Sequence, residues 1–100
     1  MGKYKIKVFP VAQDDLRDIV VYLNTLSHQA ALEYYDLIVE GIGSLAKMPK
    51  RCPLAKDLQL RLRGYRTLLV KNYIVFYVMN ENTVEIHRIL YAKRQYAELL

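Results

Sequence analysis

Residues 64–91 read Gly64-Tyr-Arg-Thr-Leu-Leu-Val-Lys-Asn-Tyr-Ile-Val-Phe-Tyr-Val-Met-Asn-Glu-Asn-Thr-Val-Glu-Ile-His-Arg-Ile-Leu-Tyr91. Three runs rich in Val, Ile, Leu, Tyr and Phe are divided by the polar breaks 71–72 and 80–82, a pattern typical of strands joined by tight turns. Parallel neighbours would need a crossover of about a dozen residues or more. The stretch therefore predicts a three-stranded antiparallel meander.

Alternation along these strands predicts what each face of the sheet carries. The middle run is apolar on both faces, which indicates an interior strand either with packing on each side or with a partly hydrophobic concave surface. We expect helices on one face and Tyr, Arg and His side chains on the other. In the last strand one face would hold Val84, Ile86, Arg88 and Leu90, and the other Glu85, His87, Ile89 and Tyr91. Arg88 is then expected to be structural, paired or stacked beneath the helices.

The chain before the meander predicts one strand and two helices. Lysines 3, 5 and 7 alternate with apolar residues, which is the period of a strand. From Ala12 to about Leu26 the apolar period becomes 3.6, and Asp14 and Asp15 are expected to be solvated helix charges. Ser27 is a candidate N-cap for a second helix, which Met48-Pro49 would end. The short connection predicts an antiparallel helix hairpin.

Residues 49–63 are expected to form a loop and then an extended segment. Leu58, Leu60 and Leu62 alternate with polar residues, so the strand at Gly64 could begin earlier, with Arg61 and Arg63 along it. The complete pattern predicts an α+β fold: an N-terminal strand, an antiparallel two-helix hairpin and the meander, forming one sheet.

Length and composition narrow the class of protein. One hundred residues suit a single domain, residues 1–100, and a hydrophobic fraction of 53% excludes a disordered chain. No apolar run reaches the length that spans a membrane, and residues 1–8 lack the apolar region of a signal peptide, so we expect a cytoplasmic protein. A single cysteine, Cys52, excludes an internal disulfide, and two histidines beside it make a zinc site improbable. We expect no metal and no cofactor.

A net charge of +5 and nine tyrosines indicate an acidic partner, either nucleic acid or protein. A basic surface that serves only solubility is the alternative. The residues expected to bind a partner or nucleic acid are Lys50, Arg51, Lys56, Arg61, Arg63, Arg66, Lys93 and Arg94.

The order of these segments resembles the RelE/ParE superfamily, the toxins of type II toxin-antitoxin modules. The resemblance rests on residues 14–23 in the first helix, on residues 45–49 at the end of the second, and on the closing strands with residues 84–96. It covers nearly the whole chain. It implies a growth-inhibiting toxin that is bound and neutralised by the C-terminal segment of a cognate antitoxin.

The superfamily divides into members that cut mRNA in the ribosome, like RelE, and members that inhibit DNA gyrase, like ParE. Residues 14–19, 72–77 and 89–96 look more like the ParE branch, so gyrase inhibition without chemistry in this chain is favoured. A plain RNA- or protein-binding module would explain the charge but not the order of the segments.

Cleavage of RNA by the 2′-hydroxyl needs a proton acceptor, a cation at the phosphate and an acid for the leaving oxygen. In a chain like RelE the resemblance implies that these come from Arg61, Arg66, His87, Tyr91, Arg94 and Tyr96. Many members have a histidine where this chain has Tyr91, which puts an imidazole base in doubt. His87, expected on the same face as Tyr91, could transfer protons or be an ordinary strand histidine.

Overall fold

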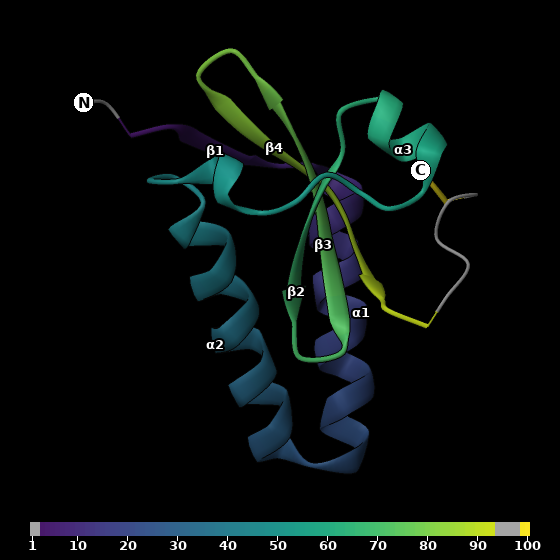
Figure 1. Ribbon diagram of the computed structural model, residues 1–100. Coiled ribbons are helices and arrows are strands. Elements are labelled where there is room, and N and C mark those ends of the chain that lie inside the picture. Colours follow the sequence, from purple (N-terminus) through teal and green to yellow (C-terminus); the bar gives the residue numbers. More distant parts are fainter. Residues whose placement is uncertain (1–2, 94–98) are drawn as a thin grey trace.

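The computed structural model describes residues 3–93 and 99–100 and contains one four-stranded sheet (Figure 1). The strand order is β1 (Lys5–Val8), β4 (Thr83–Tyr91), β3 (Tyr73–Asn80) and β2 (Arg66–Val70). The predicted meander is confirmed, because β2, β3 and β4 pair antiparallel in sequence order. β1 joins β4 in parallel, which makes the sheet mixed. The chain between them is long enough for that crossover because it contains the helix hairpin.

The two predicted helices are confirmed as α1 (Pro10–Leu26) and α2 (His28–Ser44). Pro10 occupies the first turn of α1, where its missing N–H has no helical partner in any case. Ser27 caps α2 as predicted, since its Oγ accepts the N–H of Ala30 at 3.2 Å. A Cβ on Gly41 would lie 3.2 Å from a methyl of Leu68, so this glycine lets α2 approach β2 closely.

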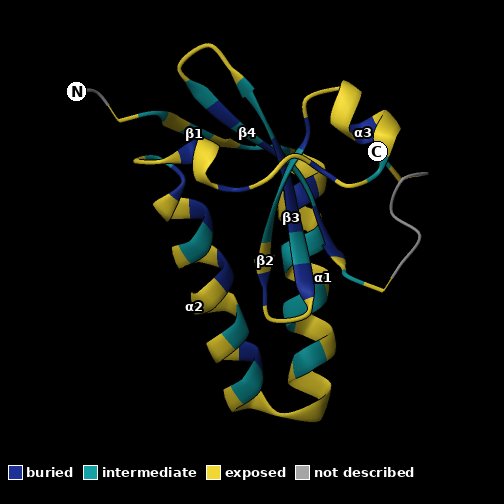
Figure 2. Ribbon diagram, viewed as in Figure 1, coloured by how far each residue is buried: buried dark blue, intermediate teal, exposed yellow. Residues whose placement is uncertain are grey.

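The sheet has a packed cluster on each side, which agrees with the apolar middle run. Buried residues recur along β3, the strand of that run (Figure 2). The larger cluster lies between the sheet and the long helices, where Ile38 of α2 meets Tyr77 of β3 and Ile86 of β4. The smaller one joins Phe76 and Leu90 of the sheet to Tyr65 and to Leu60 of a short helix, α3 (Leu58–Leu62). Each face of β3 is thereby buried, and we refer below to a helix-hairpin face and an α3 face.

The expectation of an extended segment at residues 58–62 is wrong. These residues form α3, in which the carboxylate of Asp57 accepts the N–H of Leu60 at 3.0 Å. Only Leu60 is buried, whereas Leu58 and Leu62 are exposed, so the alternating leucines do not mark one face of a strand. The Asp57 N-cap favours a helix here despite the period-two pattern. Gly64, which follows the helix, adopts the left-handed backbone conformation that commonly ends one. Arg61 and Arg63 therefore do not lie along one strand with Arg66.

The predicted faces of β4 are wrong beyond His87, because a β-bulge interrupts the strand there. Phe76 pairs with Arg88 and Tyr77 with Ile86, which leaves His87 without a partner residue in the ladder. One extra residue inverts the alternation that follows it. Ile89 consequently packs with Ile86 in the helix-hairpin cluster, and Leu90 packs on the α3 face.

Asp15 is not the solvated helix charge that the sequence predicts. Its carboxylate forms a two-pronged ion pair with Arg88, at 2.8 Å to Nε and 2.9 Å to Nη2, and also accepts the backbone N–H of Ile89 at 2.9 Å. The two side chains are only 12% and 18% exposed. β1 ends before this point of β4, so Asp15 provides an acceptor that the neighbouring strand no longer supplies. Arg88 is structural, as expected, whereas Asp14 is exposed.

Candidate functional site

Two arginines that sequence reasoning assigned to RNA cleavage bind the chain's own backbone. The guanidinium of Arg61 donates to the carbonyls of Ala55 and Lys56, at 3.0 and 2.9 Å. Arg66 donates to the carbonyls of Cys52 and Lys50, at 2.7 and 3.3 Å. These bonds fasten residues 50–56 against α3 and β2. Both cations thereby have a structural role in the basic loop.

Two of the other basic residues expected to bind a partner, Arg51 and Arg63, also form hydrogen bonds within the chain. Arg51 donates to Ser44 at the end of α2, and Arg63 donates to the carbonyl of Leu100 at 2.8 Å. Lys50, Lys56 and Lys93 are exposed. Arg94 and Tyr96 lie outside the residues that the structure describes. The loop therefore presents a basic rim near β2, and part of its charge is held in place by backbone carbonyls.

His87, the bulged residue of β4, lies at the centre of a hydrogen-bonded network with Tyr65 and Glu85. Its Nδ1 lies 2.8 Å from the hydroxyl of Tyr65, and its Nε2 lies 3.2 Å from a carboxylate oxygen of Glu85. The ring of Phe9 stacks on the imidazole at 4.2 Å. Sequence reasoning missed Tyr65 and Glu85 as partners, although the i, i+2 spacing of Glu85 and His87 was a usable signal. The arrangement orients the imidazole firmly.

Hydrogen bonds lower the pKa of the Glu85 carboxyl below its ordinary value. A hydrogen bond from Asn80, at 3.0 Å, lowers the pKa of the Glu85 carboxyl most, and the bond from His87 adds to it, while burial acts in the opposite direction. A carboxyl whose folded pKa is depressed stabilises the fold above its unfolded pKa of about 4.3. That contribution is lost as the pH falls through the folded pKa.

We expect Glu85→Gln to flatten the pH dependence of stability on the acid side. The free energy of unfolding of the wild type should fall faster than that of the variant as the pH drops below about 4.3. Urea unfolding at a series of pH values between 7 and 3 measures both curves. Glu81→Gln, at an exposed turn residue, is the control. Parallel curves for wild type and Glu85→Gln would contradict the assignment.

Tyr91 lies on the helix-hairpin face, away from the hydrogen-bonded residues Tyr65, His87 and Glu85. Its ring meets that of Tyr73 edge-on at 5.7 Å, and Tyr73 in turn meets Tyr34 of α2 at 5.9 Å. Together with Tyr22 these rings line a hollow of about 500 Å³. His87, by contrast, lies on the α3 face, where it is hydrogen-bonded to Tyr65. The structure therefore does not bring Tyr91 and His87 together, although the sequence places them on one face.

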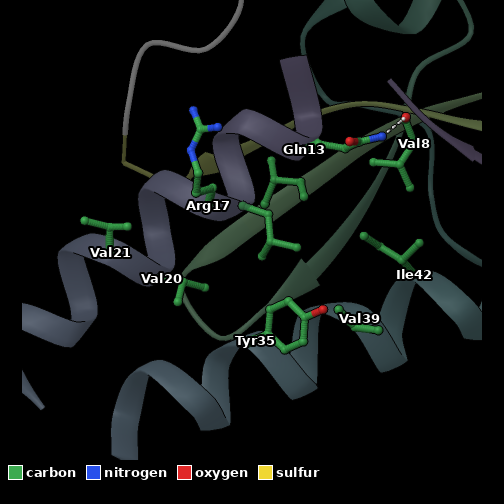
Figure 3. Close-up of a pocket in the computed structure, with 10 residues that line it drawn as sticks. Val8, Gln13, Arg17, Val20, Val21, Tyr35, Val39 and Ile42 are labelled. Atoms are coloured by element: carbon green, nitrogen blue, oxygen red, sulfur yellow. Dashed lines mark hydrogen bonds between the residues drawn. The ribbon is translucent and has the colours of Figure 1, made fainter. Parts of the chain in front are cut away.

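An apolar groove runs between α1 and α2 over the sheet (Figure 3). It encloses about 510 Å³, and Leu16, Val20 and Ile42 from the helices meet Ile89 of β4 along it. Val21 and Tyr35, which also line it, are 60% and 44% exposed. Among the described residues, Arg17 is the one charged residue that lines it. Val21 and Val39 are apolar residues that a 3.6-residue period does not require, and they were the signal in the sequence that could have revealed this groove.

The family model described as "ParE toxin of type II toxin-antitoxin system, parDE" matches residues 6–96. The chain belongs to this ParE toxin family. It is therefore a toxin of the type II toxin-antitoxin class and a member of the ParE branch of the RelE/ParE superfamily. No curated protein sequence matches it significantly.

Two solved structures share the toxin's fold. One is the chromosomal ParDE toxin-antitoxin system from P. aeruginosa, with a TM-score of 0.78 and 20% identity over 91% of this chain and 98% of the other. The second is the RelBE2 toxin-antitoxin complex from Mycobacterium tuberculosis, with a TM-score of 0.58 and 22% identity over 93% and 97% of the chains. The predicted α+β superfamily fold is thus confirmed.

Within residues 3–93 and 99–100, no three His, Cys, Asp or Glu side chains are grouped so that they could hold a metal ion. None of the helices in the same ranges is long and apolar enough to cross a membrane.

Proposed function

We propose that this ParE-family toxin inhibits growth by binding and poisoning DNA gyrase, without chemistry of its own. The observation that supports the proposal is the position of the candidate catalytic side chains, which do not lie around one site. Arg61 and Arg66 bind carbonyls of their own loop, and Tyr91 and His87 belong to opposite faces of the sheet. An RNA-cleaving site needs its base, cation and acid around one phosphate. The dispersion of these groups favours a binding surface.

A cognate antitoxin is the second partner that we propose. The solved relatives are described as a toxin-antitoxin system and a toxin-antitoxin complex. The groove between α1 and α2 suits the apolar side of an amphipathic segment, because almost all of its lining is apolar. A segment that folds on this groove would bury Val21, Tyr35 and Val39, which are exposed in the free toxin. Acidic residues of the segment would meet the basic surface of the toxin.

Purified toxin tests the choice of target directly. We expect it to inhibit supercoiling by reconstituted DNA gyrase and to leave cleaved DNA, and we expect antitoxin to reverse the inhibition. The matched reaction contains translating ribosomes and a defined mRNA. Cleavage of that mRNA with unaffected gyrase would replace the proposal by the RelE-like alternative, a ribosome-dependent mRNA endonuclease. Tyr91→Phe should leave gyrase inhibition within about threefold if no reaction is catalysed here.

A further inference from the structure

Four tyrosine rings from four different elements line one hollow, which we call the tyrosine hollow. They belong to Tyr22 of α1, Tyr34 of α2, Tyr73 of β3 and Tyr91 of β4. The hollow encloses about 500 Å³. The connection between α1 and α2 and the turn between β2 and β3 lie toward the same end of the molecule (Figure 1). The rings are therefore brought together only by the complete fold.

One ring of the tyrosine hollow is fixed inside it, and another is open to solvent. Tyr73 is buried and meets the rings of Tyr34 and Tyr91 edge-on. Burial raises the pKa of the Tyr73 hydroxyl, and the three neighbouring tyrosines raise it further, which agrees with hydroxyls that converge. Tyr22, by contrast, is 59% exposed and makes no ring contact with another described residue. Its ring is available to a partner.

A smaller hollow with a carboxylate lining adjoins the tyrosine hollow. Tyr22, Tyr73 and Tyr91 line both of them, so the two form one continuous surface. The smaller one encloses about 220 Å³, and Asp15 and Asp18 of α1 also line it. The aromatic surface thus ends at acidic side chains.

Asp18 is the carboxylate of this surface that a partner could bind. Asp15 is occupied by Arg88, and its side chain is only 12% exposed. The side chain of Asp18 is 76% exposed, and its contact with Arg17 is 3.8 Å long. Asp18 precedes Tyr22 by four residues in α1, which makes them neighbours on one face of the helix. A carboxylate and an accessible ring therefore stand side by side.

This combination suits a cation, and a guanidinium in particular. No Lys or Arg of the described ranges lines either hollow, although the chain contains 15 of these residues. A ring face attracts a cation, and a neighbouring carboxylate strengthens the attraction. A guanidinium is planar, so it can stack on a ring and donate two parallel hydrogen bonds to a carboxylate. An ammonium group has no such planar fork.

We propose that Tyr22 and Asp18 bind an arginine side chain of DNA gyrase, whose guanidinium stacks on the ring and donates to the carboxylate. The identity of this partner rests on the proposed function. Leu26, which is 68% exposed, and Tyr91 extend the apolar contact around the site. Tyrosine and arginine commonly provide most of the binding energy at the centre of protein interfaces.

Charge and position favour gyrase over the antitoxin as the source of the arginine. The groove proposed for the antitoxin shares no lining residue with the tyrosine hollow. An acidic antitoxin segment would be attracted by the basic surface of the toxin and repelled by Asp18. Both surfaces could therefore be used by different partners.

Asp18→Asn and Tyr22→Leu test the two contacts separately. Asparagine keeps the size of Asp18 without its charge, and leucine keeps apolar surface without the ring. We expect each change to weaken binding to reconstituted gyrase by at least about fivefold and to change antitoxin affinity by less than about threefold. Tyr22→Phe keeps the ring, and Asp14→Asn removes an exposed carboxylate that lines neither hollow, so both controls should stay within about twofold.

The outcomes for the two partners separate the alternatives. Gyrase binding that is unchanged in both Asp18→Asn and Tyr22→Leu would overturn the site and leave gyrase inhibition intact. Weaker antitoxin binding with unchanged gyrase binding would assign the arginine to the antitoxin and overturn the choice of gyrase. Circular dichroism of each variant confirms that it is folded.

A titration followed by nuclear magnetic resonance tests the chemistry of the site without gyrase. N-acetyl-arginine amide should shift the amide signals of Asp18, Tyr22 and Tyr91 and bind the wild-type toxin at least about threefold more tightly than N-acetyl-lysine amide. Equal affinities, or no shift at these residues, would overturn the guanidinium site. A toxin that binds the arginine compound but not gyrase would support the site and overturn the proposed target.

Discussion

Asp15→Ala is expected to destabilise the toxin by about 3 kcal/mol, the largest effect that we predict for a single change of charge. The substitution leaves the Arg88 guanidinium without its carboxylate in a site where the side chain is only 18% exposed. It also removes the acceptor of the Ile89 N–H. For a domain of this size the melting temperature should fall by roughly 10 °C or more. Urea unfolding monitored by circular dichroism measures the difference.

Asp14→Ala is the matched control, one residue earlier in the same helix. The Asp14 side chain is 59% exposed, and its contact with Arg17 is 3.4 Å long, so the expected change is within about 0.5 kcal/mol. Arg88→Met combined with Asp15→Ala should recover part of the loss, because no unpaired cation then remains. Equal losses for Asp14→Ala and Asp15→Ala would show that the pair does not hold α1 to β4.

A toxin with Val21→Asp and Val39→Asp is expected to bind its antitoxin at least about 100-fold more weakly, which corresponds to about 3 kcal/mol. The two residues line the groove from α1 and α2, and a bound apolar segment would leave both carboxylates buried without partners. Because Val21 and Val39 are 60% and 42% exposed in the free toxin, the fold should tolerate the change. Isothermal titration calorimetry measures the affinity.

Leu32→Asp controls for the added charge in this experiment. Leu32 is an exposed residue of α2 that does not line the groove, so its substitution should change the affinity by less than about threefold. Circular dichroism of each variant confirms its folding. Unchanged binding by the double variant would place the antitoxin elsewhere on the toxin.

Much of the fold could be predicted from local pattern. The apolar runs and short polar breaks of residues 64–91 specify the antiparallel meander, because no other connection fits between those strands. The change of period at Ala12 and the cap at Ser27 give the helix hairpin. Alternation failed at residues 58–62, where a capped helical turn competed with it. The alternation also failed to predict the faces of β4 beyond His87, where a bulge adds one residue and no residue type in the sequence indicates it.

The candidate surfaces were less accessible from the sequence. The sequence identified the basic residues but not the groups that they bind. Whether a guanidinium faces solvent or a backbone carbonyl depends on how the loop folds over β2. The groove between α1 and α2 is formed by residues distant in the chain, so the apolar residues of either helix alone indicate only part of it.

By itself the sequence determined the elements, their order, the superfamily and the positive charge of the toxin, since these follow from local periodicity, turn residues and composition. Only the tertiary structure decided that β1 lies parallel to β4, that Asp15 is buried against Arg88, and that Tyr91 and His87 part to opposite faces. The physical reason is that each of these depends on which distant residues meet. Those contacts form when the complete sheet packs between the helix hairpin and α3, and no local sequence pattern specifies them.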